Sequence, residues 1–213
     1  MPSAVHTVFV SDELAVDAEV LAYYDQGRER RRLERTSRLE FLRTSELLER
    51  FLPAAPATVL DIGGGWGGLG LYLAQHCGAR VTGVTLSEEQ FKLACGRAAE
   101  RGLSGRAEFR LQDYRDLDEQ FDHVVSIEMF EAVGERWWPT YFRTVARALK
   151  PGGRAVIQSI TIRDDLFPDY RKGTDFIQQY VFPGGMLPSR SAFRAAAARQ
   201  GLAVHGEYAF GAD

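Results

Sequence analysis

The sequence has few cysteines, no long apolar run and no large excess of either charge. Its two cysteines, Cys77 and Cys95, are too few for a disulfide framework, and both are expected to be reduced in a cytoplasmic protein. No stretch approaches the roughly 20 apolar residues of a membrane span. The net charge of −3 provides no general attraction to nucleic acid, so no such partner is expected. The four histidines lack ligand spacing, so no metal site is expected.

What is present is typical of a globular chain. Of the 213 residues, 45% are hydrophobic and 26% are charged, which favours one domain with a sizeable core over a disordered chain. The first 20 residues carry acidic side chains but no Arg or Lys, so no signal peptide is expected.

Hydrophobic periodicity divides the chain into two parts. Residues 12–52 have helical spacing, and 1–56 are predicted to form a helical extension that packs on a domain spanning 57–213. In the second part, short apolar runs alternate with helical patterns. The predicted strands are 58–62, 80–85, 107–111, 123–127, 154–160 and 202–208, and the predicted helices are 66–76, 87–101, 138–149 and 189–200. This alternation predicts an α/β fold: a doubly wound, mostly parallel sheet with helices on both faces.

A glycine-rich loop follows the first of these strands. The run VLDIGGGWGG (59–68) places Asp61 at the strand end and Gly63, Gly65 and Gly67 at alternate positions before a helix. Glycines let a backbone turn sharply and approach a ligand at the carboxyl end of the sheet. The spacing is neither the Gly-x-Gly-x-x-Gly of dinucleotide sites nor a phosphate-binding loop. The loop therefore suits a nucleoside without phosphates.

This loop resembles motif I of the class I S-adenosylmethionine (SAM) methyltransferases. With VTGVTLSEEQ (81–90), VVSIEMFEAVGERWWPTYF (124–142), LKPGGRAVIQSITI (149–162) and FIQQYVFPGGMLPS (176–189), the chain is similar to the cyclopropane-fatty-acid synthase family, including mycolic-acid cyclopropane synthases and fatty-acid C-methyltransferases. The resemblance implies their Rossmann-like fold. It also implies transfer of one carbon from SAM to the double bond of an unsaturated acyl lipid, giving a methylated or cyclopropanated product.

The resemblance also implies a SAM site at the strand ends. Glu88 is an alternative ribose partner, disfavoured because it lies in the first turn of its helix. The implied cofactor-binding residues are Asp61, Gly63, Gly65 and Gly67 in the loop, Thr85, Leu86 and Gln90 near the ribose, Asp113 and Tyr114 near adenine, and Ser126 and Ile127 near the sulfonium.

The implied chemistry needs a base. An alkene that attacks the methyl group of SAM becomes a carbocation, and a proton must then leave for a ring to close. The family places a carboxylate at Glu131, where it holds a bicarbonate that acts as the base. Glu128 is a second candidate catalytic carboxylate, and Gln158 stands where the synthases have a histidine, which favours methyl transfer over cyclopropanation. Nearby aromatic residues could face a cation or simply pack the core: Phe130, Trp137, Trp138, Tyr180 and Phe182.

Some features depart from this family and leave alternatives open. Residues 23–53 resemble the lead-in helices of small-molecule methyltransferases, so an acceptor O, N or C atom on a small metabolite is an alternative. A SAM-binding fragment without turnover is another. The resemblance also implies an antiparallel seventh strand that lies between strands five and six in the sheet. No sequence is expected to remain for it, so an uncovered sheet edge is expected.

A basic stretch precedes the α/β part. It suggests peripheral contact with phospholipid headgroups at the inner face of the membrane, although a solvated helix face with Glu–Arg pairs is the favoured interpretation. The oligomeric state is left open. The stretch comprises Arg28, Arg30, Arg31, Arg32, Arg35 and Arg38.

Overall fold

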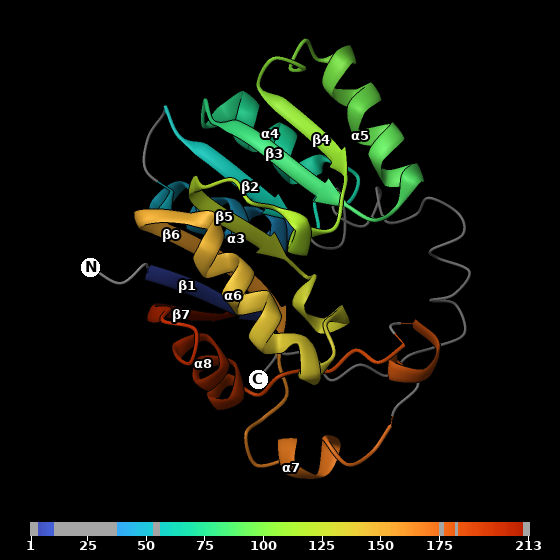
Figure 1. The fold of residues 1–213 in the computed structure, drawn as a ribbon, viewed down its shortest axis with the longest axis vertical. Helices are drawn as coiled ribbons and strands as arrows, with labels where there is room; N and C mark the ends of the chain where they lie inside the picture. The colour runs from blue at the N-terminus through green and yellow to red at the C-terminus, as the bar shows by residue number, and fades with distance from the viewer. Residues whose placement is uncertain (1–3, 11–37, 53–55, 175–176, 182, 211–213) are drawn as a thin grey trace.

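The computed structural model describes residues 4–10, 38–52, 56–174, 177–181 and 183–210, and its core is a sheet of seven strands (Figure 1). The strands are β1 (Ala4–Val10), β2 (Thr58–Ile62), β3 (Arg80–Thr85), β4 (Ala107–Leu111), β5 (Phe121–Ile127), β6 (Leu149–Ile160) and β7 (Ala203–Phe210). Their order is β4-β3-β2-β5-β6-β1-β7, and every neighbouring pair is parallel. The predicted doubly wound sheet is confirmed.

Helices connect the strands and cover both faces of the sheet. The α-helices are α3 (Arg38–Phe51), α4 (Gly68–His76), α5 (Glu88–Glu100), α6 (Trp138–Ala148), α7 (Phe167–Tyr170) and α8 (Arg190–Ala198). Shorter turns are η1 (Tyr114–Asp116), η2 (Phe130–Ala132), η3 (Glu135–Trp137) and η4 (Ile177–Val181). Among the described residues, none of the helices is long and apolar enough to cross a bilayer.

Two apolar clusters hold the helices to the sheet. Leu47 and Leu48 of α3 pack with side chains of α4, α5 and one face of the strands, including Val125 and Val156. The other face packs against α6 and α8 around Phe130. Residues alternate between the two faces along a strand, so neighbouring residues of β5 and β6 serve different clusters.

Strand β1 corrects two expectations. Residues 4–10 belong to the predicted helical extension but form a strand, while α3 is helical and 11–37 lie outside the described residues. The expectation that no sequence remains for a seventh strand is also wrong. β1 lies between β6 and β7 (Figure 1). Ala4 is opposite Arg154 on one side and Ala203 on the other.

The reason is that order along the chain does not fix order in a sheet. The run AVHTVFV has the β-branched and apolar composition of a strand, but the expectation considered only the residues that follow the sixth predicted strand. The place expected for an antiparallel strand is filled by a parallel one from the amino-terminal part. The sheet therefore has β4 and β7 as its edges.

Candidate functional site

The glycine loop is tied to the neighbouring strand at the carboxyl edge of the sheet. The backbone N–H groups of Gly63 and Gly64 both donate to the carbonyl oxygen of Val84 in β3, over 3.1 and 2.9 Å. Gly63 lies at φ 79°, and a Cβ there would be 2.7 Å from Cγ of Met129. Glycine is therefore required at position 63 both by backbone conformation and by space.

The next two glycines of the loop, Gly65 and Gly67, have different roles. Gly65 lies at φ 50°, and a Cβ there would meet only the carbonyl oxygen of Gly63, at 3.8 Å. A Cβ at Gly67 would be 2.8 Å from Cβ of Ala94 and 3.0 Å from the ring of Phe109. Gly67 thus lets α4 pack against α5 and β4, whereas Gly65 borders open space in which a ligand could approach the backbone.

Asp61 lies under this loop and is almost fully buried. Its side chain is 1% exposed, and Oδ2 has no hydrogen-bond partner among the described residues. Burial raises the pKa of Asp61 to about 7. An unpaired buried carboxyl beside a glycine loop costs stability, which points to a ligand-binding role.

The residues expected near the ribose lie together. The hydroxyl of Thr85 donates to Oε1 of Gln90 over 2.7 Å, and Ser87, the N-cap of α5, fixes the intervening turn. Leu86 is 72% exposed beside them. The alternative residue Glu88 is instead exposed and paired with Lys92 at 3.0 Å.

The residues expected near adenine follow β4. Asp113 caps η1 and accepts hydrogen bonds from the backbone and the guanidinium of Arg115, which lower the pKa of Asp113. Tyr114 is half-buried, and its ring meets that of Tyr141 edge-on at 5.8 Å. The carboxylate of Asp113 is thus occupied by Arg115, while the phenol of Tyr114 lies between the strand end and α6.

Glu131 is a buried carboxyl that is only half satisfied. One oxygen accepts from the backbone N–H of Ile160, but Oε2 has no partner among the described residues. Burial outweighs the effect of hydrogen bonding and raises the pKa of Glu131. Its own carbonyl oxygen accepts from the N–H of Met186 at 3.0 Å, which ties η2 to the segment after η4.

Two hydroxyls on the same face of the sheet are also unsatisfied. Ser126 in β5 is fully buried, and Tyr141 of α6 lies beside it. Neither hydroxyl oxygen has a well-formed hydrogen bond within the described part of the chain. Burial raises the pKa of Tyr141, and the electrostatic effects of Tyr114 and Glu131 act in the same direction. Three buried oxygen atoms are therefore available to a small polar ligand.

The other two predicted catalytic residues form a separate pair. Gln158 in β6 is 1% exposed, and its Nε2 donates to Oε1 of Glu128 over 3.3 Å. Its Oε1 accepts from the hydroxyl of Thr44 in α3 over 2.6 Å. Glu128 is exposed at the end of β5, after Ile127. The structure thus brings Gln158 to Glu128, while the described hydrogen bonds of Glu131 lead elsewhere.

Sequence reasoning missed Thr44 and Tyr141. Thr44 lies one helical turn before Leu47 and Leu48, so a polar residue on the buried stripe of α3 was the available signal. Tyr141 follows Trp138 by one turn on the buried face of α6. Neither pattern indicates which residue the side chain contacts, because the contacted residues lie on distant strands.

The predicted aromatic residues are divided between core and surface. Phe130 and Trp138 are buried, with ring centroids 5.4 Å apart, so core packing accounts for both. Trp137 is 42% exposed and Tyr180 67% exposed. Phe182 and the basic residues from Arg28 to Arg35 lie outside the described residues, as does the side chain of Arg38.

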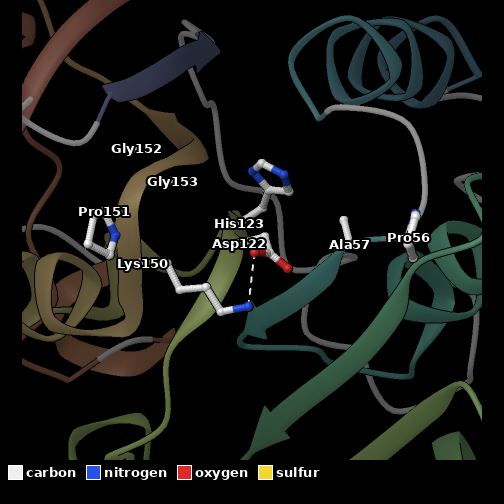
Figure 2. Close-up of a pocket in the computed structure, with 8 residues that line it drawn as sticks. All are labelled: Pro56, Ala57, Asp122, His123, Lys150, Pro151, Gly152 and Gly153. Atoms are coloured by element: carbon white, nitrogen blue, oxygen red, sulfur yellow. Dashed lines mark hydrogen bonds and ion pairs between the residues drawn. The ribbon is translucent and has the colours of Figure 1, made fainter.

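The opposite edge of the sheet contains a cavity of about 280 Å³ (Figure 2). It lies where β2, β5 and β6 begin, and the ion pair between Lys150 and Asp122 spans 2.9 Å in its wall. The predicted site residues lie at the other ends of the strands. No group of three or more potential metal ligands is found among the residues that the structure describes.

The sheet order, the glycine loop and the polar residues at the strand ends define the fold of the class I SAM methyltransferases. A model of the mycolic acid cyclopropane synthetase family matches residues 40–213, and the chain belongs to this family.

Two curated relatives and one solved structure are similar. Tuberculostearic acid methyltransferase UfaA1 of Mycobacterium tuberculosis is 48% identical over 134 residues, 63% of this chain and 31% of that protein. Cyclopropane-fatty-acyl-phospholipid synthase of Escherichia coli K12 is 47% identical over 132 residues, 62% of this chain and 32% of that protein. Mycolic acid cyclopropane synthase CmaA1, complexed with SAH and CTAB, is 25% identical with a TM-score of 0.67, covering 89% of this chain and 76% of that chain. The chain spans about a third of the length of these two curated relatives.

Proposed function

We propose that the chain binds SAM and transfers one carbon from it to the double bond of an unsaturated fatty acyl chain. Family membership and the two relatives support the reaction class. The observation that carries the proposal is the half-satisfied carboxyl of Glu131, buried beside two unpaired hydroxyls at the carboxyl edge of the sheet.

The residues present fit SAM. Gly65 leaves open space above the loop, the phenol of Tyr114 lies at the end of β4, and Thr85 with Gln90 offers polar atoms for a ribose. SAM supplies an electrophilic methyl group when it is bound. The proposed contribution of the chain is to orient that group toward the acceptor and to exclude water from the buried side of the site.

The residues also fit a bicarbonate beside Glu131. Three buried oxygen atoms without partners offer hydrogen bonds to a small anion: Glu131 Oε2, Ser126 Oγ and Tyr141 Oη. Burial raises the pKa of Glu131, and a carboxyl that takes up a proton can donate a hydrogen bond to an anion. A bound bicarbonate would supply a base for the proton that leaves the acceptor. Gln158 bonds Glu128 and Thr44, and these bonds give no support for a contact between Gln158 and the anion.

Because the proposed acceptor is a lipid, the proposal also includes peripheral contact between the chain and a lipid surface. Trp137 and Leu166 are 42% and 49% exposed, and the guanidinium of Arg136 lies 5.1 Å from the Trp137 ring centroid. The ion pair of Arg171 with Glu135, at 2.6 Å, joins α7 to η3. Sedimentation with anionic and neutral vesicles tests this contact, and equal absence from both pellets contradicts it.

The experiment that tests the reaction uses the full 213-residue chain. SAM binding is measured by calorimetry, and an unsaturated phospholipid dispersion is then added, with a saturated dispersion as the matched control. We expect the unsaturated lipid alone to gain one carbon by mass spectrometry, and NMR then separates a ring from a branch. Binding without a mass gain contradicts the lipid reaction and favours a small metabolite or a non-catalytic fragment. Absence of binding contradicts the cofactor.

A further inference from the structure

The amide of Gln158 is held at both ends. A primary amide has an acceptor end and a donor end. The acceptor, Oε1, takes the hydroxyl proton of Thr44 over 2.6 Å, and the donor, Nε2, faces Oε1 of Glu128 at 3.3 Å. A carboxylate only accepts, so it requires the donor end, and Thr44 must then donate to the other end. The three side chains form a directed chain from α3 across β6 to the end of β5.

Glu128 also has an unusual backbone. Its φ of 51° is the only positive value among the described residues other than glycine. The left-handed conformation is strained for an L-residue, and such strain persists only when neighbouring groups hold it. The backbone N–H of Glu128 donates to the carbonyl oxygen of Gln158 over 3.0 Å. A single residue, Gln158, therefore holds both the main chain and the carboxylate of Glu128.

The chain from Thr44 is separate from the surroundings of Glu131. Val156 and Val125 pack on the face covered by α3, and by alternation Gln158 shares that face with Val156. Glu131 instead bonds the strand end at Ile160 and belongs with the α6 side. The two carboxyls at this edge of the sheet thus have independent supports.

We propose that Thr44 is a positioning residue, which acts through Gln158 to hold the carboxylate of Glu128 at the mouth of the candidate site. Glu128 is exposed there, so its fixed charge can face a cationic group. The chemical class is a cation: the sulfonium of SAM or the positive charge that develops on the acceptor carbon. This role rests on the proposed function, whereas the hold of Thr44 on Gln158 does not.

Three variants of the full chain separate positioning from packing. Thr44→Val has nearly the same shape but lacks the hydroxyl, and Thr44→Ser keeps it. Ser45→Ala is the matched control, because Ser45 is similarly buried on the same helix but its hydroxyl interacts with Tyr72. Each variant is measured for thermal unfolding, for affinity toward S-adenosylhomocysteine (SAH), and for kcat and KM on the unsaturated lipid.

We expect Thr44→Val to lower kcat about tenfold, with KM and SAH affinity within about twofold, because the amide of Gln158 then loses its anchor on α3 and can turn away from Glu128. Thr44→Ser restores kcat. Ser45→Ala loses thermal stability but keeps kcat. In a Glu128→Gln background Thr44→Val adds no further loss, because an amide at 128 can pair with either end of Gln158. Normal kcat in Thr44→Val, or equal losses in Thr44→Val and Ser45→Ala, overturns the proposal.

A second measurement does not depend on turnover. The side-chain amide protons of Gln158 are identified in ¹⁵N-labelled protein by their absence from Gln158→Met. We expect their shifts and hydrogen exchange to change in Thr44→Val and to stay close to wild type in Thr44→Ser and Ser45→Ala. Unchanged signals in Thr44→Val overturn the hold of Thr44. Altered signals in a protein that methylates no lipid support that hold and contradict only the proposed function.

Discussion

Asp61 and Asp122, which lie on neighbouring strands, show how differently the two edges of the sheet are built. Asp122, at the amino edge, accepts from the backbone N–H of Thr58 at 2.8 Å, from its hydroxyl at 2.7 Å and from Lys150 at 2.9 Å. These bonds hold the pKa of Asp122 well below its usual range. Asp61, at the carboxyl edge, has an unpaired oxygen, and burial raises its pKa to about 7.

The contrast indicates a division of labour. At the amino edge, polar groups are paired within the chain and connect strand starts, which stabilises the fold. At the carboxyl edge, Asp61, Ser126 and Glu131 each keep a buried oxygen unpaired, at a cost in stability of roughly 1–3 kcal/mol for each group. The buried Nδ1 of His123 is an unpaired atom at the amino edge, so the contrast is one of degree.

The largest expected effect is the change of stability with pH that Asp61 causes. In the folded chain the carboxyl of Asp61 keeps its proton up to about pH 7, whereas an unfolded aspartic acid releases its proton near pH 3.8. The contribution of Asp61 to stability is therefore fully present below pH 3.8 and is lost as the pH rises through about 7. The slope between these values is at most about 1.4 kcal/mol per pH unit. Urea unfolding of wild type and Asp61→Asn from pH 4 to 8 measures it.

The comparison of these two proteins isolates Asp61. Glu131 also has a raised pKa, but it is present in both, so its contribution cancels in the difference. We expect Asp61→Asn to gain stability relative to wild type as the pH rises. A difference that stays flat across the pH range contradicts the unpaired, buried state of Asp61.

The next largest effect concerns Glu131. Glu131→Gln keeps the hydrogen bond from Ile160 but cannot share a proton with an anion, so we expect turnover on lipid to fall about 100-fold or more. SAH affinity and thermal stability stay close to wild type. Calorimetry measures the SAH affinity, thermal unfolding measures the stability, and mass spectrometry of the lipid measures the turnover. Unchanged turnover removes Glu131 from the mechanism.

A smaller effect is expected at the glycine loop. Gly65→Val fills the open space beside the loop and should weaken SAH binding more than about tenfold. Gly102→Val is the control: its φ is 65°, close to that of Gly65, and a Cβ there meets nothing within 4 Å. Both variants carry a similar backbone strain, but only Gly65→Val loses affinity in calorimetry. Equal affinities in the two variants would show that the loop does not approach the cofactor.

The sequence predicts those parts of the fold that depend on local signals. The helix predicted at 87–101 begins at Ser87, which is the N-cap of α5, and the side chain of Ser87 accepts from the N–H of Gln90. Asp61, Thr85 and Ser126 lie at or next to the ends of predicted strands, so parallel pairing alone places them at one edge.

Contacts between distant segments escape this reasoning. The position of β1 between β6 and β7 depends on pairing with strands more than 140 residues away, as in Ala4 with Arg154. The hydrogen bond of Thr44 to Gln158 joins residues 114 positions apart. No spacing within either segment encodes the partner, because the partner is chosen by packing of the whole sheet.

The smallest expected effect tests the amino edge. Asp122→Asn removes the ion pair with Lys150 but keeps an acceptor for Thr58. The Asp122 side chain is 36% exposed, so screening by solvent keeps the loss of folding stability small. We expect a loss of about 1 kcal/mol in urea unfolding at pH 7, and a smaller loss at high salt because surface charges are screened. SAH affinity should not change, because the ion pair lies at the edge opposite the glycine loop. If Asp122→Asn weakened SAH binding as much as it weakened the fold, the two edges would be coupled, and the division between a stabilising edge and a binding edge would fail.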